Sequence, residues 1–200
     1  MKKANRRAKY KAGVQAEILE AARQLFAQEG YEKFSMRALA ERIGYSTAAT
    51  YKHFKSKGEI FEYLAEESFA ALMAASESVK NIRGEDPVAR LKRGMHAYVN
   101  FGLESPGHYR FAFLVHRPVS IRPPKPRAAY SGLRGRVQNC IDAGKFRRGD
   151  AELMAQSLWA AAHGVTSLLI QKPTFPWVAR RKLIGQVVDS AIAGLLAGRK

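Results

Sequence analysis

Two short helical patterns on either side of Gly44 limit the fold more than any other feature of the sequence. The first pattern covers 36–43 and follows Ser35, a residue type that caps helices. The second covers about 46–54 and again begins at a hydroxyl residue, Ser46. Helices this short are marginal in water, so both must pack against another element. Two short helices joined by a glycine-containing turn predict a helix-turn-helix.

A longer helix is predicted just before this motif. Apolar residues recur every three or four positions from Val14 to Phe26, and Gly30 is suited to end that helix. Further helical patterns cover about 57–79, 87–104, 106–116, 127–146, 150–172 and 177–197, with glycine or proline at the breaks. Because no segment alternates with a period of two, we expect an all-α chain.

The charge of the chain predicts a polyanionic partner. Lys and Arg number 34 against 17 Asp and Glu, which gives a net charge of +17. Residues 1–57 carry 13 basic and 5 acidic side chains, a net +8 in little more than a quarter of the chain. Such a field attracts DNA, RNA or an anionic membrane surface, although charge also keeps proteins soluble. Residues 1–11 hold six basic side chains and no acid, so we expect a basic disordered arm there.

Several other classes of protein are disfavoured. A single cysteine, Cys140, excludes an internal disulfide or a thiolate metal cluster. We interpret it as a small buried hydrophobe, with a redox sensor as the alternative. The histidines lack metal-ligand spacing, and neither a catalytic nucleophile motif nor a phosphate-binding loop occurs, so we expect no metal, no cofactor and no enzyme activity. Without a signal peptide or a long apolar run, we expect a cytoplasmic location and no membrane partner.

The residues from Phe34 onward run FSMRALAERIGYSTAATYKHFKSKGEIF. This sequence resembles the N-terminal signature of TetR-family transcriptional regulators. The matching positions are Gly30-Tyr31, Ser35, Leu39-Ala40, Ile43-Gly44, Ser46, Tyr51, His53-Phe54 and Ser56-Lys57. The resemblance implies a three-helix, homeodomain-like head with a helical body for effector binding and dimerisation. We therefore divide the chain into the arm (1–11), a DNA-binding domain (12–56) and a regulatory domain (57–200).

A helix that reads DNA needs small or polar side chains at its start, so that its backbone can enter the major groove. By resemblance, Thr47, Ala48, Tyr51, Lys52, His53 and Lys57 occupy positions that touch DNA in this family. Hydroxyl and basic groups at helix starts extend the set, and Thr50 stands where an apolar residue is common, which leaves it free to reach DNA. The predicted DNA-binding residues are Ser35, Arg37, Ser46, Thr47, Ala48, Thr50, Tyr51, Lys52, His53 and Lys57. Helix packing for Tyr51 and a solvated position for Lys52 are the alternatives.

The C-terminal part carries a second, weaker resemblance. The stretch SLWAAAHGVTSLLI (157–170) is similar to the Trp-x-x-x-His-Gly pattern of one C-terminal subclass, the WHG subclass. Its small residues permit close helix approach, and the last helix has an apolar stripe at Leu183, Val187, Ile192 and Leu195. In this family the two final helices of each subunit usually pair, so we expect a homodimer formed through them. His163 is open to three interpretations: a core histidine, an interface residue or an effector contact.

A tentative effector pocket completes the set of predicted sites. Its residues are Tyr98, Phe101, Tyr109, Phe113, Trp159 and His163, although ordinary core packing explains the aromatic residues equally well. The proline-rich segment 117–127 is either a surface loop or a loop that gates a ligand. The predicted function is that of a sequence-specific regulator of operator DNA, most simply a repressor released by a small molecule. The alternative is a non-specific nucleic-acid-binding protein.

Overall fold

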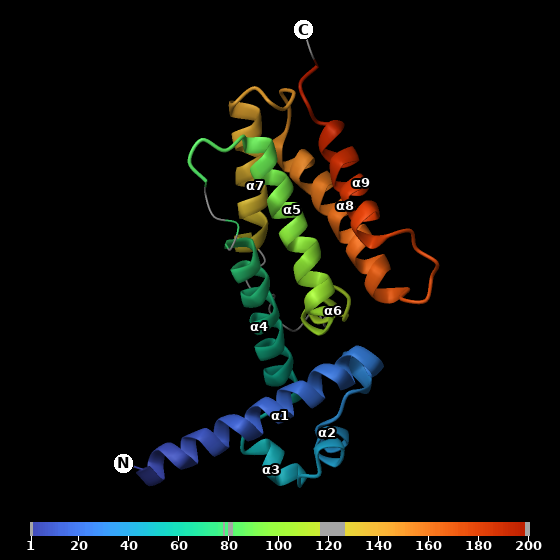
Figure 1. Ribbon diagram of the computed structural model, residues 1–200. Coiled ribbons are helices and arrows are strands. Elements are labelled where there is room, and N and C mark those ends of the chain that lie inside the picture. Colours follow the sequence, from blue (N-terminus) through green and yellow to red (C-terminus); the bar gives the residue numbers. More distant parts are fainter. Residues whose placement is uncertain (1, 78, 80–81, 117–126, 199–200) are drawn as a thin grey trace. The chain divides into compact units, whose positions relative to one another are not determined.

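The protein is entirely helical in the part that its computed structural model describes, residues 2–77, 79, 82–116 and 127–198 (Figure 1). The side chains of residues 2–9, 11, 77 and 127–129 lie outside that description. The helices are α1 (Lys2–Lys33), α2 (Met36–Ile43), α3 (Thr47–Tyr51), α4 (Lys57–Glu77), α5 (Pro87–Glu104), α6 (Pro106–Phe113), α7 (Arg127–Asp142), α8 (Ala151–Gln171) and α9 (Arg180–Ala193). Among the described residues the only β-type pairing is an isolated bridge between Phe146 and Leu196. The all-α prediction is confirmed.

Helix α1 extends further toward the N-terminus than we expected. It begins at Lys2, so the segment predicted to be a disordered arm is helical in the structure. Ala, Lys and Arg are strong helix formers, and no glycine or proline precedes Gly13, so nothing local stops the helix. Helical geometry is interrupted at Gly30, where φ is 77°, a conformation that favours glycine.

The chain divides into two compact units. Unit 1 comprises Met1–Phe69 and Gly107–Pro124, and unit 2 comprises Ala70–Pro106 and Lys125–Lys200. Helix α4 therefore begins in unit 1 and ends in unit 2. The domain boundary that we predicted at residue 56 stays a prediction. It separates a DNA-binding from a regulatory function, whereas the two units are defined by how the chain packs. The proline-rich segment 117–127 lies outside the described residues, apart from the first residue of α7.

Unit 1 is organised around aromatic side chains. Phe26 of α1 stacks on Phe34 with ring centroids 4.0 Å apart, and the edges of Phe61 and Phe111 approach it at 5.2 and 5.8 Å. All four rings are buried, with Leu39 among them. The core thus joins α1, α2, α4 and α6, and it is this core that supports the two short helices.

Unit 2 is a bundle in which α5 packs against α7, α8 and α9, and α8 also contacts α7 and α9. Helix α8 is long and apolar enough to cross a membrane by length and composition alone, but nine of its residues are buried within the bundle. A core helix of a soluble protein has the same character. Cys140 is fully buried, and burial raises the pKa of its thiol to about 11, so the thiol is protonated near neutral pH and resembles a small apolar side chain.

Candidate DNA-binding site

Side-chain caps define the two helices of the helix-turn-helix. The Ser35 hydroxyl accepts a hydrogen bond from Ala38 N at 3.1 Å, and the Ser46 hydroxyl accepts one from Ala49 N at 3.1 Å. Gly44 adopts the left-handed conformation, with φ of 70°, so the chain turns sharply between the helices. Helix α3 is shorter than the predicted 46–54, because after Tyr51 the chain tightens into a turn.

Helix α2 is held on α1 by polar contacts as well as by the core. The Arg42 guanidinium donates hydrogen bonds to the side-chain oxygens of Gln24 and Gln28, at 3.1 and 3.2 Å. The Tyr45 hydroxyl donates to Glu17 at 3.1 Å. These contacts come from residues on the surface of α1, which therefore orients the motif.

The exposed surface of α3 and the turn after it carries most of the predicted DNA contacts. Ala48, Tyr51 and Lys52 are exposed and Thr47 is partly exposed. The Tyr51 side chain is 49% exposed, a large fraction for an aromatic residue, and this disfavours the packing interpretation. A small residue, two hydrogen-bonding side chains and a cation thus share one accessible segment.

Thr50 corrects our prediction. It is fully buried, and its hydroxyl donates to the carbonyl oxygen of Ser46 at 3.3 Å within the same helix turn. The side chain is small enough to fill an inward position while its one polar group is satisfied locally. Thr50 therefore supports α3 and is not available to contact DNA.

His53 and Lys57 are less free than the sequence suggested. Nδ1 of His53 is buried and makes no hydrogen bond within the described residues. The Lys57 ammonium donates to the carbonyl oxygens of Tyr31 and Glu32, at 3.1 and 3.5 Å, and lies 4.5 Å from the centre of the Tyr31 ring. Lys57 thus stabilises the last residues of α1, which follow Gly30. A DNA phosphate would have to compete with these two carbonyl oxygens for the Lys57 ammonium.

The hydroxyls of Ser35 and Ser46 can still donate a hydrogen bond while they accept one as caps. Arg37 is 83% exposed and pairs with Glu41 at 2.9 Å, one turn along α2. An exposed pair of this type is weak, so Arg37 can exchange its partner for a phosphate at little cost.

Two side chains cap the start of α4, and the contribution of Glu59 was not predicted from the sequence. The Ser56 hydroxyl accepts from Glu59 N at 3.1 Å, while the Glu59 carboxylate accepts from Lys55 N. The Ser-x-x-Glu spacing of 56–59 is a sequence signature of this cap and could have revealed it. It stabilises a helix start that Gly58 would otherwise weaken.

Comparison with known proteins agrees with this geometry. Residues 18–64 match the family described as bacterial regulatory proteins, tetR family, and residues 91–193 match the tetracyclin repressor-like C-terminal domain. The chain belongs to the TetR family. The matches cover the helix-turn-helix and more than half of the chain, so this is a DNA-binding transcriptional regulator, and the family is not one of enzymes. The finer WHG resemblance stays a prediction.

Individual relatives include transcriptional repressors. The HTH-type transcriptional repressor AcnR of Corynebacterium efficiens is 34% identical over 131 residues, 62% of this chain and 69% of the relative. The nucleoid occlusion factor SlmA of Vibrio campbellii is 36% identical over 107 residues, 53% of this chain and half of the relative. The solved structure of the TetR-family regulator PfmR from Thermus thermophilus matches with a TM-score of 0.69 at 26% identity, over 90% of this chain and 99% of that one.

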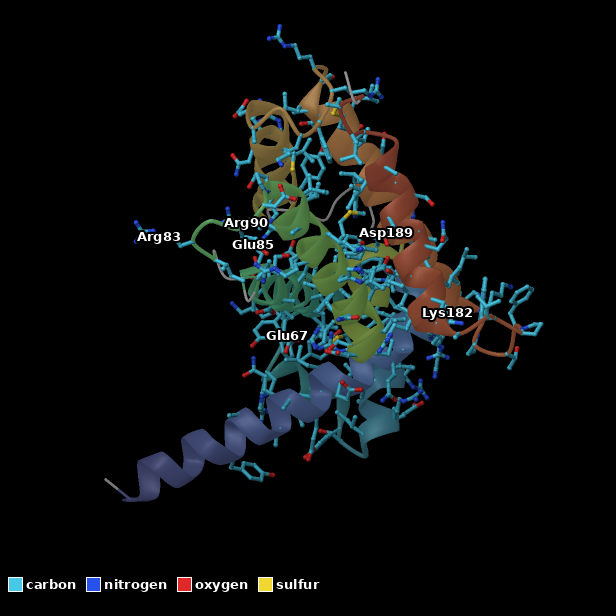
Figure 2. All side chains as sticks on the ribbon, turned by 45° about the horizontal axis from the view of Figure 1, so that its top comes forward. Glu67, Arg83, Glu85, Arg90, Lys182 and Asp189 are labelled. Carbon is cyan, nitrogen blue, oxygen red and sulfur yellow. The ribbon has the colours of Figure 1, made fainter. Side chains whose placement is uncertain are left out.

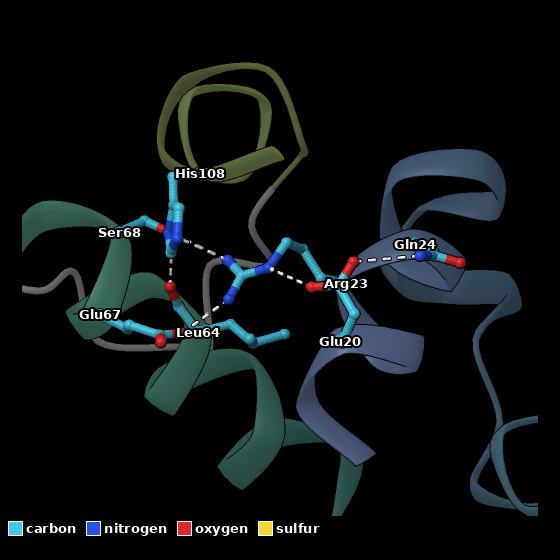
Figure 3. Close-up of polar contacts among 7 residues, drawn as sticks. All are labelled: Glu20, Arg23, Gln24, Leu64, Glu67, Ser68 and His108. Atoms are coloured by element: carbon cyan, nitrogen blue, oxygen red, sulfur yellow. Dashed lines mark hydrogen bonds and ion pairs between the residues drawn. The ribbon is translucent and has the colours of Figure 1, made fainter. Parts of the chain in front are cut away.

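This TetR-family head also contains a charged cluster around a buried arginine, which we did not predict (Figure 3). The Arg23 side chain on α1 is only 10% exposed; it pairs with Glu67 of α4 at 2.6 Å and with Glu20 at 3.5 Å. The same guanidinium lies 3.2 Å from His108 Nδ1 on α6. Burial and then the charge of Arg23 lower the pKa of His108, so the imidazole stays neutral and accepts from Arg23. The buried position of Arg23 could not be predicted, because in the sequence it is a single basic residue beside the apolar stripe of α1.

The six residues of the tentative effector pocket belong to both units. In unit 2, the Tyr98 hydroxyl lies 3.2 Å from His163 Nδ1 and accepts a hydrogen bond from Trp159 Nε1 at 3.2 Å. Phe101 is buried in the same unit, whereas Tyr109 and Phe113 belong to unit 1 and contact each other there. Burial lowers the pKa of His163, so this imidazole also favours its neutral form. Tyr98, Trp159 and His163 therefore form one hydrogen-bonded group within unit 2.

Proposed function

We propose that the protein is a transcriptional repressor that binds operator DNA as a homodimer and is released by a small-molecule effector. The accessible side chains of α3 and its following turn, Tyr51 above all, carry this proposal. They project from a motif that the unit 1 core and the contacts to α1 hold in place. Two such motifs in one dimer would enter successive major grooves and exclude polymerase. We place the protein in the cytoplasm, where the operator is.

The first experiment measures specificity. The full chain is titrated against the promoter of its own operon and against random duplex of equal length, at near-physiological salt. A specific regulator should prefer the promoter by at least about 10³-fold. A ratio near one would refute the proposal in favour of a non-specific nucleic-acid-binding protein.

The second experiment tests the recognition surface. Tyr51→Ala should abolish operator binding while dimer formation and thermal stability stay unchanged, because the side chain is exposed. Tyr63→Ala is the matched control, since Tyr63 is 44% exposed on α4 outside the motif. If Tyr51→Ala binds the operator normally, the recognition surface lies elsewhere.

We further propose that dimerisation uses α8 more than α9. Exposed or partly exposed residues recur along one side of α8 at Leu153, Ser157, Ala160, Gly164 and Leu168. A side chain added at Gly164 would meet nothing within 4 Å in its own chain, which leaves room for a partner helix. On α9 our expectation needs correction: Ile192 and the following Leu195 are buried in the core of their own unit. Leu183 and Val187 are only partly buried, so the α9 contribution would come from these two residues.

Leu168→Lys tests this interface. Leu168 is 48% exposed, and a charge there should disrupt a face that a partner covers. Val178→Lys is the control, because Val178 is 65% exposed in the α8–α9 connection, outside the stripe. Light scattering should show a monomer for Leu168→Lys alone; a dimer in both variants would refute this interface.

For the effector, we propose contact with Tyr98, Trp159 and His163. The supporting observation is that their polar atoms hydrogen-bond to one another in a small group formed by α5 and α8. An effector that replaces one of these bonds would shift the population of conformations. Effector-dependent release should therefore weaken in Tyr98→Phe, while operator affinity without effector is unchanged.

A further inference from the structure

Three partly buried arginines of unit 2, Arg90, Arg93 and Arg136, form a cluster. Arg136 of α7 is partly buried, and its guanidinium donates one hydrogen bond to the carbonyl oxygen of Ser76, near the end of α4, at 3.1 Å. Arg90 and Arg93 of α5 are close enough to act on it electrostatically. Among the described side chains, no carboxylate forms an ion pair with Arg90 or Arg136.

The helix packing brings the guanidinium unusually near the backbone of α5. A Cβ added at Gly94 would lie 3.1 Å from an Arg136 terminal nitrogen and 3.3 Å from its central carbon. The absence of a side chain at Gly94 therefore leaves room for the Arg136 guanidinium close to the helix. Within the guanidinium only one of five N–H donors is used by a described partner, and the other donors are accessible for further hydrogen bonds.

The neighbouring acids whose side chains are described, Glu85 and Asp86, already have partners. Glu85 forms a two-pronged contact with Arg93, at 2.7 Å for both oxygens. Asp86 caps α5 by accepting from Ala89 N, and it also pairs with Lys145 at 3.5 Å. Among the described side chains, Arg93 and Lys145 are therefore paired with these two acids, whereas Arg90 and Arg136 form no ion pair; Arg90 and Glu85 are labelled in Figure 2. Burial and then the charges of Arg90 and Arg93 lower the pKa of Arg136, which is the expected response of a cation held among like charges.

We propose that Arg136, with Arg90 and Arg93, binds the oxyanion group of a small molecule, a carboxylate or a phosphate. A planar guanidinium matches such a group through two parallel hydrogen bonds, and the added negative charge relieves the repulsion among the arginines. The inference deepens the proposed function and rests on it, because it names the chemical class of the effector.

The position of the cluster on α5 fits an effector with two kinds of group. Arg90, Gly94 and Tyr98 follow one another at intervals of four, so they share one side of the helix. Eight residues of helix span about 12 Å. An anionic head at the arginines would therefore place the rest of a small molecule toward the Tyr98, Trp159 and His163 group.

The site has a second consequence for control of DNA binding. Ser76 belongs to α4, the helix that follows the helix-turn-helix in unit 1 and ends in unit 2. An oxyanion that draws the Arg136 guanidinium away would release the carbonyl at the far end of that helix. Binding of the anion would then favour a different α4 position from that of the free protein.

The test titrates the full chain with inorganic phosphate and, separately, with succinate, at constant ionic strength set by potassium chloride. Calorimetry and thermal shift report binding without DNA. Arg136→Met should weaken binding by roughly 10- to 100-fold, the loss of one charge-assisted pair of hydrogen bonds. Arg134→Met is the matched control, since Arg134 lies on the same helix and is already paired with Glu152 at 3.1 Å.

Arg90→Met is a second variant, which tests the site in case Arg136→Met fails to fold. The Arg90 side chain makes no hydrogen bond to a described residue, so its replacement should weaken oxyanion binding by about tenfold while the fold is kept. Wild-type protein that binds neither phosphate nor succinate would overturn the inference, as would equal binding by Arg136→Met and Arg134→Met.

Binding to operator and to random duplex is measured without added oxyanion. If folded Arg136→Met loses DNA affinity there, the arginines contact DNA phosphates and the inference is overturned. A wild-type protein without operator preference counts against the repressor proposal alone, because phosphate and succinate binding is measured independently.

Discussion

Replacement of Arg23 by methionine tests what the charged cluster of unit 1 contributes to stability. The Arg23 side chain is 10% exposed, and its bond to Glu67 at 2.6 Å is charge-assisted. Such a bond contributes about 1.5–3 kcal/mol. However, Glu67 and Glu20 are 44% and 63% exposed, so water can solvate both carboxylates once the arginine is gone. Methionine also keeps the apolar stem in place.

We therefore expect Arg23→Met to lower the free energy of unfolding by about 1–2 kcal/mol, below the usual cost of breaking a fully buried pair. Urea unfolding followed by circular dichroism measures this at one fixed protein concentration, because dimer dissociation makes stability depend on concentration. Glu67→Gln should cost more in wild type than in the Arg23→Met background, since the two residues interact directly.

Arg37→Met is the control, because Arg37 is 83% exposed and its pair with Glu41 is a surface contact. It should leave the urea midpoint unchanged. If Arg23→Met unfolds at the wild-type midpoint, or if both variants lose stability equally, the buried position of Arg23 has no energetic consequence and the reasoning fails.

Three further predictions concern DNA affinity and pH. Because Thr50 is buried, Thr50→Val should leave operator affinity within about twofold of wild type, whereas Thr47→Val should weaken it by about fivefold. Fluorescence anisotropy measures both affinities, and a larger loss for Thr50→Val would contradict the prediction. The lowered pKa of His108 means that the folded protein resists protonation, so stability should fall as pH drops below the ordinary value of 6.5. Urea midpoints between about pH 7 and 5.5 should fall less in His108→Gln, although His163 adds a loss of the same sign. Deletion of residues 1–11 should weaken binding to all DNA and reduce the salt dependence while preserving sequence preference; unchanged affinity and salt dependence would show that this segment has no role.

Much of the head could be predicted because its signals are local. Ser35, Gly44 and Ser46 act within one helix turn, and the structure places α2 at the residues we expected. The apolar spacing from Val14 to Phe26 likewise predicted the helix against which the motif packs. The later helices agree with the predicted ranges to within a few residues at their ends, because glycine and proline break helices by their own conformational limits.

Side-chain environment was less predictable. Thr50 lies in a segment of small polar residues. Nothing in the sequence of that segment distinguishes its buried hydroxyl from the accessible hydroxyl of Thr47. Lys57 was expected to face DNA, yet it binds carbonyls that lie 25 and 26 residues earlier in the chain. The aromatic residues assigned to one pocket divide between two units.

By itself, the sequence determined the helices, the helix-turn-helix and the basic character of the protein, since spacing, caps and charge are properties of neighbouring residues. Only the tertiary structure decided which polar groups are free to act. Arg23 meets Glu67 and His108 from 44 and 85 residues away, and Arg136 reaches Ser76 across 60. Such contacts depend on how the helices pack, and packing sets the desolvation and charge that each group experiences.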